Sequence, residues 1–244
     1  MAFSYAGSPI AIRDDLTAAH GRVWERLGSP GTWFDATTRV EVAAELRNAR
    51  HCTLCRRRKE AVSPYTLDGL HDGLGTLPES RVEIIHRIVT DPGRLTQSWY
   101  RRMLATGISE EEYVELVGLI AHVTVLDSFA RAVCMSAQPL PEPKPGAPTR
   151  YRPAEARQHE HWVPTIAFED HGPNEADMFP VKPANIRLAM TLVPAEARSF
   201  FDLSANQYLA GPKMFDFGHE FRAITHRQIE LLAGRISALN QCHY

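Results

Sequence analysis

The sequence lacks a charge excess, a secretory signal and a long apolar stretch. Its 244 residues carry 27 Lys and Arg against 29 Asp and Glu, a formal net charge of −2, so broad binding to nucleic acid or to an anionic membrane is not expected. No apolar run reaches the roughly 18 residues that a membrane span needs. Residues 1–13 lack a basic start followed by a long apolar core, which argues against a signal peptide. We therefore expect a cytoplasmic protein that binds neither membranes nor nucleic acid.

Cysteine is scarce as well, with four in the whole chain. Two of them, Cys52 and Cys55, form a Cys-x-x-Cys motif. In a chain without an export signal such a pair is more often redox-active or metal-binding than a structural disulfide. Cys134 has no cysteine near it on its predicted helix, and we expect it to be a small core residue.

Sustained apolar/polar alternation of the strand type is absent, which predicts an all-α fold. The length suggests one large or two small domains. Ser109, followed by three glutamates, gives a capping box at the start of a long apolar helix that we expect in the core. Helical patterns are found at residues 37–49, 81–90, 109–133, 185–192, from 194 onward and at 225–240. We expect Thr37 or Thr38 to cap the first of these helices.

A proline-rich segment divides the chain. Residues 139–148 contain alternating prolines and predict a semi-rigid extended linker. We expect a first helical module over residues 1–138 and a second over residues 149–244. A faint repeat supports a duplication, because residues 39–47 lead to Cys52 much as residues 228–235 lead to Cys242.

The Cys52/Cys55 pair allows three interpretations. Surrounding arginines and a helix start favour thiolate, the form that attacks peroxides and disulfides. Zinc is less favoured, since a structural site needs four ligands and the sequence shows no second Cys/His pair of matching spacing; no metal is expected. The third interpretation is a buried, inert pair beside a solvated basic helix face.

Nearby side chains could assist the thiols. Glu41 and Glu45 lie one helical turn apart before the pair, and either could face the sulfurs as a proton acceptor. For at least one of them, surface ion pairs with Arg39 and Arg47 are the better explanation. His51 is adjacent to Cys52 and could stabilise its thiolate, or be solvated.

The C-terminal segment resembles a known signature. Glu230, eleven intervening residues, Cys242 and two further residues resemble the Glu-x11-Cys-x-x-Cys motif of AhpD-like alkylhydroperoxidases, in the carboxymuconolactone decarboxylase-like superfamily. Residues 107–117 and 139–143 also look like this family, so the resemblance covers residues ~36–244. It implies an all-helical, usually homo-oligomeric protein without a bound cofactor.

The resemblance also implies roles for residues near the C-terminus. Cys242 would be the resolving thiol and Glu230 the proton-relay carboxylate. His243 lies inside the motif, at a position to which the family assigns no role. The attacking residue would occupy position 245, and a selenocysteine codon read as a stop would produce this ending, as would an artificially shortened chain or a degenerate natural terminus.

At the first pair the resemblance implies that Cys55 attacks and Cys52 resolves. Glu41 is one residue too close to match the motif, and Lys59 stands where the family has histidine. The expected function is thiol- or selenol-dependent reduction of hydrogen peroxide or organic hydroperoxides, with a thiol protein or small thiol as reductant. The alternatives are a decarboxylase- or isomerase-like enzyme on the same fold, or a non-catalytic helical oligomer.

Overall fold

The chain folds almost entirely into helices. The computed structural model describes residues 3–179, 185–240 and 242. Over these residues it has ten α-helices and no strand, which confirms the predicted all-α class. The helices are α1 Asp14–Leu27, α2 Ala36–Ala49, α3 Thr53–Glu60, α4 Glu79–Thr90, α5 Gln97–Ala105, α6 Glu110–Ala132, α7 Asn185–Leu188, α8 Pro194–Gln207, α9 Gly211–Met214 and α10 His226–Leu239.

The helices form two compact units, Met1–Leu203 and Ser204–Tyr244. The division falls within α8, whereas the predicted boundary at residues 139–148 lies inside the first unit. A duplicated module is not shown. The Cys52/Cys55 pair belongs to the first unit, and Cys242 belongs to the second.

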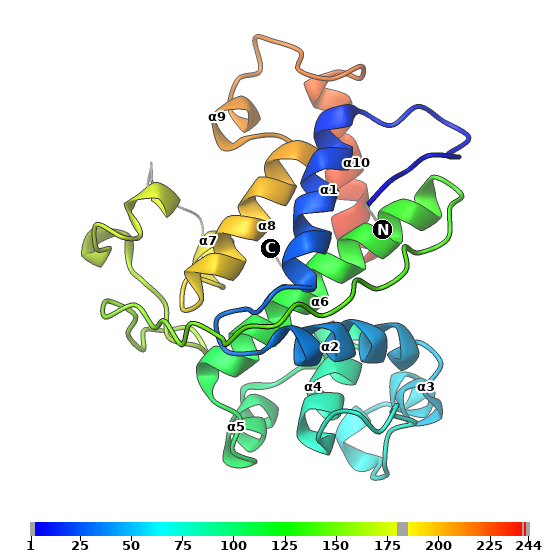
Figure 1. The fold of residues 1–244 in the computed structure, drawn as a ribbon, viewed down its shortest axis with the longest axis vertical. Helices are drawn as coiled ribbons and strands as arrows, with labels where there is room; N and C mark the ends of the chain where they lie inside the picture. Colours follow the sequence, from blue (N-terminus) through cyan, green and yellow to red (C-terminus); the bar gives the residue numbers. More distant parts are fainter. Residues whose placement is uncertain (1–2, 180–184, 241, 243–244) are drawn as a thin grey trace. The chain divides into compact units, whose positions relative to one another are not determined.

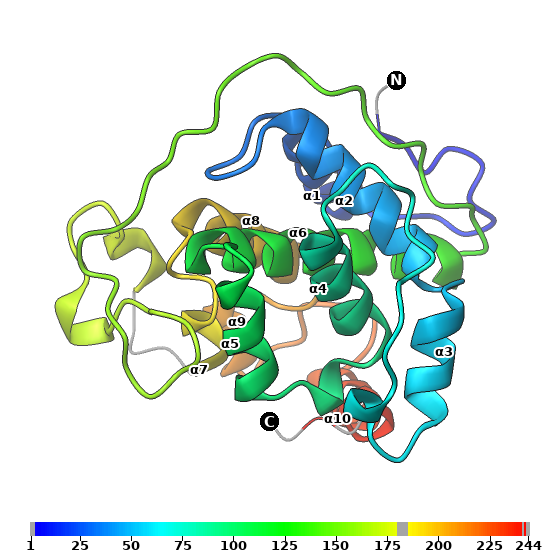
Figure 2. The same ribbon diagram turned by 90° about the horizontal axis from the view of Figure 1, so that it is seen from below.

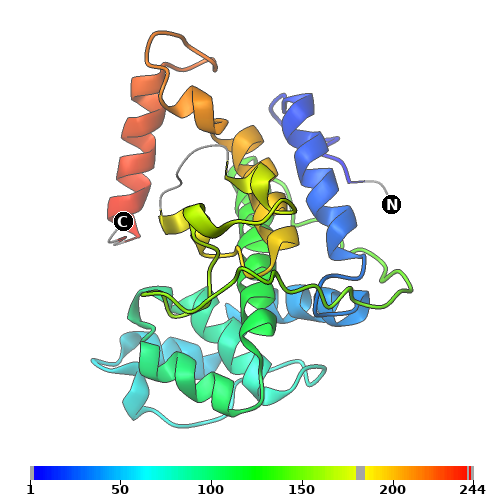
Figure 3. The ribbon, with the colours of Figure 1, turned by 90° about the vertical axis from the view of Figure 1, so that its left-hand side faces the viewer.

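Helix α6 is the central element of the first unit. The predicted capping box is present, with the Ser109 side chain accepting from Glu112 N and the Glu112 side chain accepting from Ser109 N. Helices α1, α2 and α4 all pack against α6, which runs the length of the unit in Figures 1 and 3. Its buried apolar residues, among them Leu116 and Val123, join the main hydrophobic core.

By length and composition α6 is also long and apolar enough to cross a membrane, contrary to the expectation that no segment would be. Of the most apolar 18-residue stretch of α6, 61% is buried inside the protein. Packing in the protein core therefore accounts for its composition.

Helix α2 carries the residues that precede the cysteine pair. The predicted helix is confirmed, but its cap is Asp35, whose Oδ1 accepts from Thr38 N at 2.8 Å, rather than Thr37 or Thr38 itself. Helix α3 follows directly with Cys52 as its N-cap residue. This short connection places the pair at the junction of two helices that both pack on α4.

The proline-rich segment lies along the first unit. Trp24 Nε1 donates to Pro139 O at 3.0 Å, and Lys144 N donates to Gly28 O at 2.8 Å. Figure 2 shows the chain after α6 returning past α1 and α2 in an extended path. The prolines therefore favour an extended segment, as predicted, and that segment is attached along its length to the helices.

Cys134 is exposed, so its predicted place in the core is wrong. It follows the last turn of α6 with φ 56°, in the left-handed region. Met135 N donates to Ala130 O at 2.8 Å and closes the helix end there. Because the chain turns away at this point, the Cys134 side chain leaves the apolar face of the helix.

A charged cluster is buried where α2, α6 and α8 meet. The Arg39 guanidinium donates from Nη1 to Glu115 Oε1 and, at 2.9 Å, to Glu196 Oε1. Arg39 is 1% exposed, and both carboxylates are 0% exposed. Gly31 gives them room, because a Cβ there would collide with Glu115 Oε1. Arg39 is therefore a buried partner of Glu115 and Glu196, and the interpretation that pairs it with Glu41 or Glu45 on the surface is wrong.

Candidate functional site

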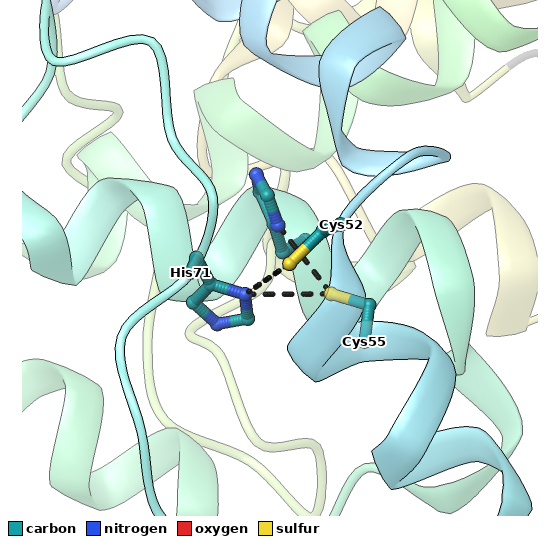
Figure 4. Close-up of side chains that lie close together, drawn as sticks. Cys52, Cys55 and His71 are labelled. Atoms are coloured by element: carbon teal, nitrogen blue, oxygen red, sulfur yellow. Dashed lines mark hydrogen bonds between the residues drawn. The ribbon is translucent and has the colours of Figure 1, made fainter.

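Cys52 and Cys55 are buried together at the start of α3. They are 2% and 3% exposed, and neither is in a disulfide. Cys52 is the N-cap residue of α3 and Cys55 lies in its first turn, which turns both side chains toward α4 and the loop before it (Figure 4).

Two histidines complete the cluster. His71 comes from the loop before α4 and His86 from the buried face of α4. The His71 Nδ1 atom lies 3.5 Å from Cys52 Sγ and 3.4 Å from Cys55 Sγ, as Figure 4 shows. The His86 Nδ1 atom lies 3.4 Å from Cys55 Sγ. All four potential ligand atoms lie within 4.8 Å of one another.

Each histidine is oriented by a carboxylate on its far nitrogen. His71 Nε2 lies 2.7 Å from Glu83 Oε2, and His86 Nε2 lies 2.8 Å from Glu45 Oε1. The Glu45 carboxylate also accepts from Leu74 N at 2.9 Å. In the neutral tautomer that carries its proton on Nε2, each ring donates to its carboxylate and turns the lone pair of Nδ1 toward the sulfurs. Carboxylate–histidine pairs of this kind orient metal-bound histidines in proteins.

The distances fit a single tetrahedral ion. With Zn–S bonds of about 2.3 Å and Zn–N bonds of about 2.05 Å, tetrahedral geometry separates sulfur from nitrogen by roughly 3.5 Å. The three observed separations are 3.5, 3.4 and 3.4 Å. The donor set of two sulfurs and two imidazoles is one that structural zinc sites use.

The His71 ring and the Cys52 thiol of the cluster have shifted pKa values in the absence of a metal. Burial would lower the pKa of His71, but hydrogen bonds with Cys55, Glu83 and Cys52 raise it to about 10. Burial also opposes ionisation of Cys52, yet the N–H groups of Cys55 and Asp72, together with the His71 ring, lower the pKa of this thiol. In a metal-free cluster these interactions favour the imidazolium form of His71 and the thiolate form of Cys52, and binding of a metal cation would release a proton.

Two surface hollows flank the cluster. One, of about 420 Å³, is lined by both cysteines and by basic residues of α3. The other, of about 480 Å³, is lined by His71 and Glu83. The sulfurs are therefore buried but lie at the wall of a hollow that opens to solvent.

Of the assisting residues predicted from the sequence, the structure places only Glu45 in the cluster. Glu41 is half-buried on α2 and is not among the described hydrogen-bond partners of the cysteines or histidines. His51 and Lys59 are exposed and line the basic hollow. Arg47 pairs with Asp127 rather than with a glutamate of its own helix. His71, His86 and Glu83 were not identified from the sequence.

The second predicted site lies in the second unit. Glu230 Oε1 accepts from the Tyr208 hydroxyl and lies 3.4 Å from His226 Nε2, so these are its described partners. Burial and Glu230 raise the pKa of Tyr208 to about 12. Cys242 is exposed, with its backbone N donating to Ser237 O at 3.0 Å. His243 lies outside the described residues.

Comparisons with protein-family models, with curated proteins and with solved structures found no match for this chain. The resemblance to alkylhydroperoxidases therefore stays a prediction from the sequence motifs.

Proposed function

We propose that the first unit is a zinc-binding unit in which Cys52, Cys55, His71 and His86 hold one Zn²⁺. One observation carries this proposal: four ligand atoms, from three buried residues and the half-buried His71, lie within 4.8 Å of one another, and each histidine has a carboxylate behind it. All four positions are supplied by protein, which is typical of a structural rather than a catalytic zinc site. The ion would join the start of α3, the loop before α4 and α4 itself.

Elemental analysis of the purified full chain tests this directly. We expect one zinc per chain, and in Co²⁺-substituted protein the visible absorption of a tetrahedral, thiolate-bound ion. The Cys55→Ser variant should lose most of the metal, because serine hydroxyl is a poor zinc ligand at neutral pH. Cys134→Ser is the matched control, since Cys134 is exposed and outside the cluster. Full zinc content in Cys55→Ser would contradict the assignment.

The same thiols support a second candidate function, the reduction of hydroperoxides. The observation that favours it is the hollow of about 420 Å³ whose wall includes both sulfurs. In the metal-free, reduced chain a hydroperoxide would oxidise one thiolate, and the other thiol would close the disulfide. A thiol protein or small thiol would then restore the pair.

Peroxide consumption by the metal-free chain in the presence of a thiol reductant is expected to depend on this pair. Cys55→Ser should abolish turnover, because either attack or resolution is lost. Cys134→Ser should retain it. Unchanged consumption in Cys55→Ser would refute this second function and leave the zinc proposal standing.

A further inference from the structure

The hollow beside the cysteines is lined by basic side chains without acidic ones. Arg50, Arg56 and Lys59 line it, and no Asp or Glu does. All three are exposed, and the structure gives them no ion pair within its described residues. Three positive charges therefore surround a space that reaches Cys52 and Cys55.

Two neighbouring arginines, Arg47 and Arg58, are paired with carboxylates, whereas the three basic residues that line the hollow have no such pairing among the described residues. Arg47 pairs with Asp127 at 2.8 Å, and Arg58 pairs with Glu83 at 2.8 Å. A charge on a ligand in the hollow would lie well within the screening length of about 8 Å at physiological salt. Clefts lined by one sign of charge concentrate ligands of the opposite sign.

The hollow is also much larger than hydrogen peroxide requires. A water molecule occupies about 30 Å³ in the liquid, whereas the hollow has a volume of about 420 Å³. Volumes of roughly 300–1,000 Å³ are usual for sites that bind organic ligands. Ala49 and Val89 add apolar surface to the wall.

We propose that this hollow selects organic hydroperoxides that carry a negative charge, such as a carboxylate, and presents their O–O bond to Cys52 and Cys55. The inference rests on the peroxide-reducing function proposed above. Arg50, Arg56 and Lys59 hold the anionic end, and the apolar wall contacts the carbon chain.

The reaction balances with the two thiols as the sole electron donors. One thiol gives up its proton and its sulfur attacks the peroxide, so that an S–O bond forms, the O–O bond breaks and the alkoxide takes up that proton to leave as the alcohol. The second thiol gives up its proton and attacks the resulting sulfenic acid, so that the S–S bond forms, the S–O bond breaks and hydroxide takes up this proton to leave as water. The hydroperoxide is reduced by two electrons, and the pair is oxidised by two.

A matched pair of probes tests the charge selection. Linoleic acid hydroperoxide and its methyl ester differ only in the charge at one end. Each is mixed with the reduced, metal-free full chain, and the reaction is quenched by alkylation. Mass spectrometry of the peptide that contains Cys52 and Cys55 then gives the rate of disulfide formation. We expect the acid to react on the order of tenfold faster than the ester at low salt, with the ratio falling as salt is added.

The double variant Arg56→Gln/Lys59→Gln should bring the ratio of acid to ester close to one. Arg101→Gln/Arg157→Gln is the control, since it removes two exposed charges that do not line the hollow and should keep the ratio. Equal rates for acid and ester in the unmodified chain would overturn the charge selection and leave peroxide reduction intact. Disulfide formation with neither probe would overturn both.

Discussion

Removing the metal is expected to lower the free energy of unfolding of the first unit by about 4 kcal/mol or more. Binding to the native state stabilises it by about 4.1 kcal/mol when free ligand exceeds the dissociation constant a thousandfold. The loop of residues 67–78 before α4 has little regular structure, and His71 and Asp72 attach it to the start of α3. Without an ion this loop loses its strongest attachment, and we expect it to open first.

Thermal unfolding with and without a zinc chelator measures this effect. Hydrogen exchange at the Leu74 amide, which donates to Glu45, reports on the loop alone. The chelator should lower the midpoint of the unmodified chain and accelerate exchange at Leu74. In Cys55→Ser, which has no metal to lose, it should change neither. A midpoint that the chelator leaves unaltered in the unmodified chain would contradict a zinc centre of structural importance.

Replacing Arg39 by methionine is expected to lower the free energy of unfolding by about 3–5 kcal/mol, the usual cost of removing one partner from a buried ion pair. Arg39 is the shared partner of Glu115 and Glu196. Methionine fills much of the space but leaves Glu115 without its cation, and leaves Glu196 with the partly exposed Arg26 and with His122, whose Nδ1 lies 3.6 Å away. The exposed Arg101→Met is the control and should stay within about 0.5 kcal/mol of the unmodified chain.

The destabilisation by Arg39→Met should depend on pH. Burial would raise the pKa of Glu196, but Arg39, Arg26 and His122 lower it to about 2, from 4.5. A depressed carboxyl pKa contributes stability above the unfolded value, and this contribution disappears as the pH falls through the folded one. The deficit of Arg39→Met should therefore be largest at neutral pH and shrink between about pH 4.5 and pH 2. Urea unfolding at several pH values measures it, and a deficit independent of pH would rule out the electrostatic explanation.

Much of the helical structure could be predicted because its signals are local. The Ser109 capping box and the last helix both lie where their sequences indicate. The N-cap of α2 was misplaced because Asp35 accepts the hydrogen bond that Thr37 or Thr38 was expected to accept. Division into compact units depends on contacts between distant segments, and the proline-rich segment gave no sign that it would pack against residues 24–32.

Of the four proposed ligands, only the two cysteines could be predicted, because the two histidines join them through contacts between segments that are distant in sequence. The spacing of Cys52 and Cys55 is a local signal, whereas His71 lies in an irregular loop and His86 in an apolar helix, without a paired spacing. A clue was nevertheless present, because Glu45 and His86 both lie on the buried faces of helices. Buried polar groups need partners, so two such residues on packed helices point to one another. For the C-terminal motif, the roles of Cys242 and Glu230 stay predictions from the sequence resemblance.

The spacing of the ligands along the chain has a consequence for synthesis on the ribosome. All four proposed ligands lie between residues 52 and 86, so they are all present once residue 86 has been synthesised. Arg39, by contrast, can pair with Glu196 only after synthesis has continued 157 residues beyond it. Contacts between residues close in sequence form with a smaller entropic cost than distant ones. Metal capture would therefore precede the neutralisation of the buried guanidinium by its second carboxylate.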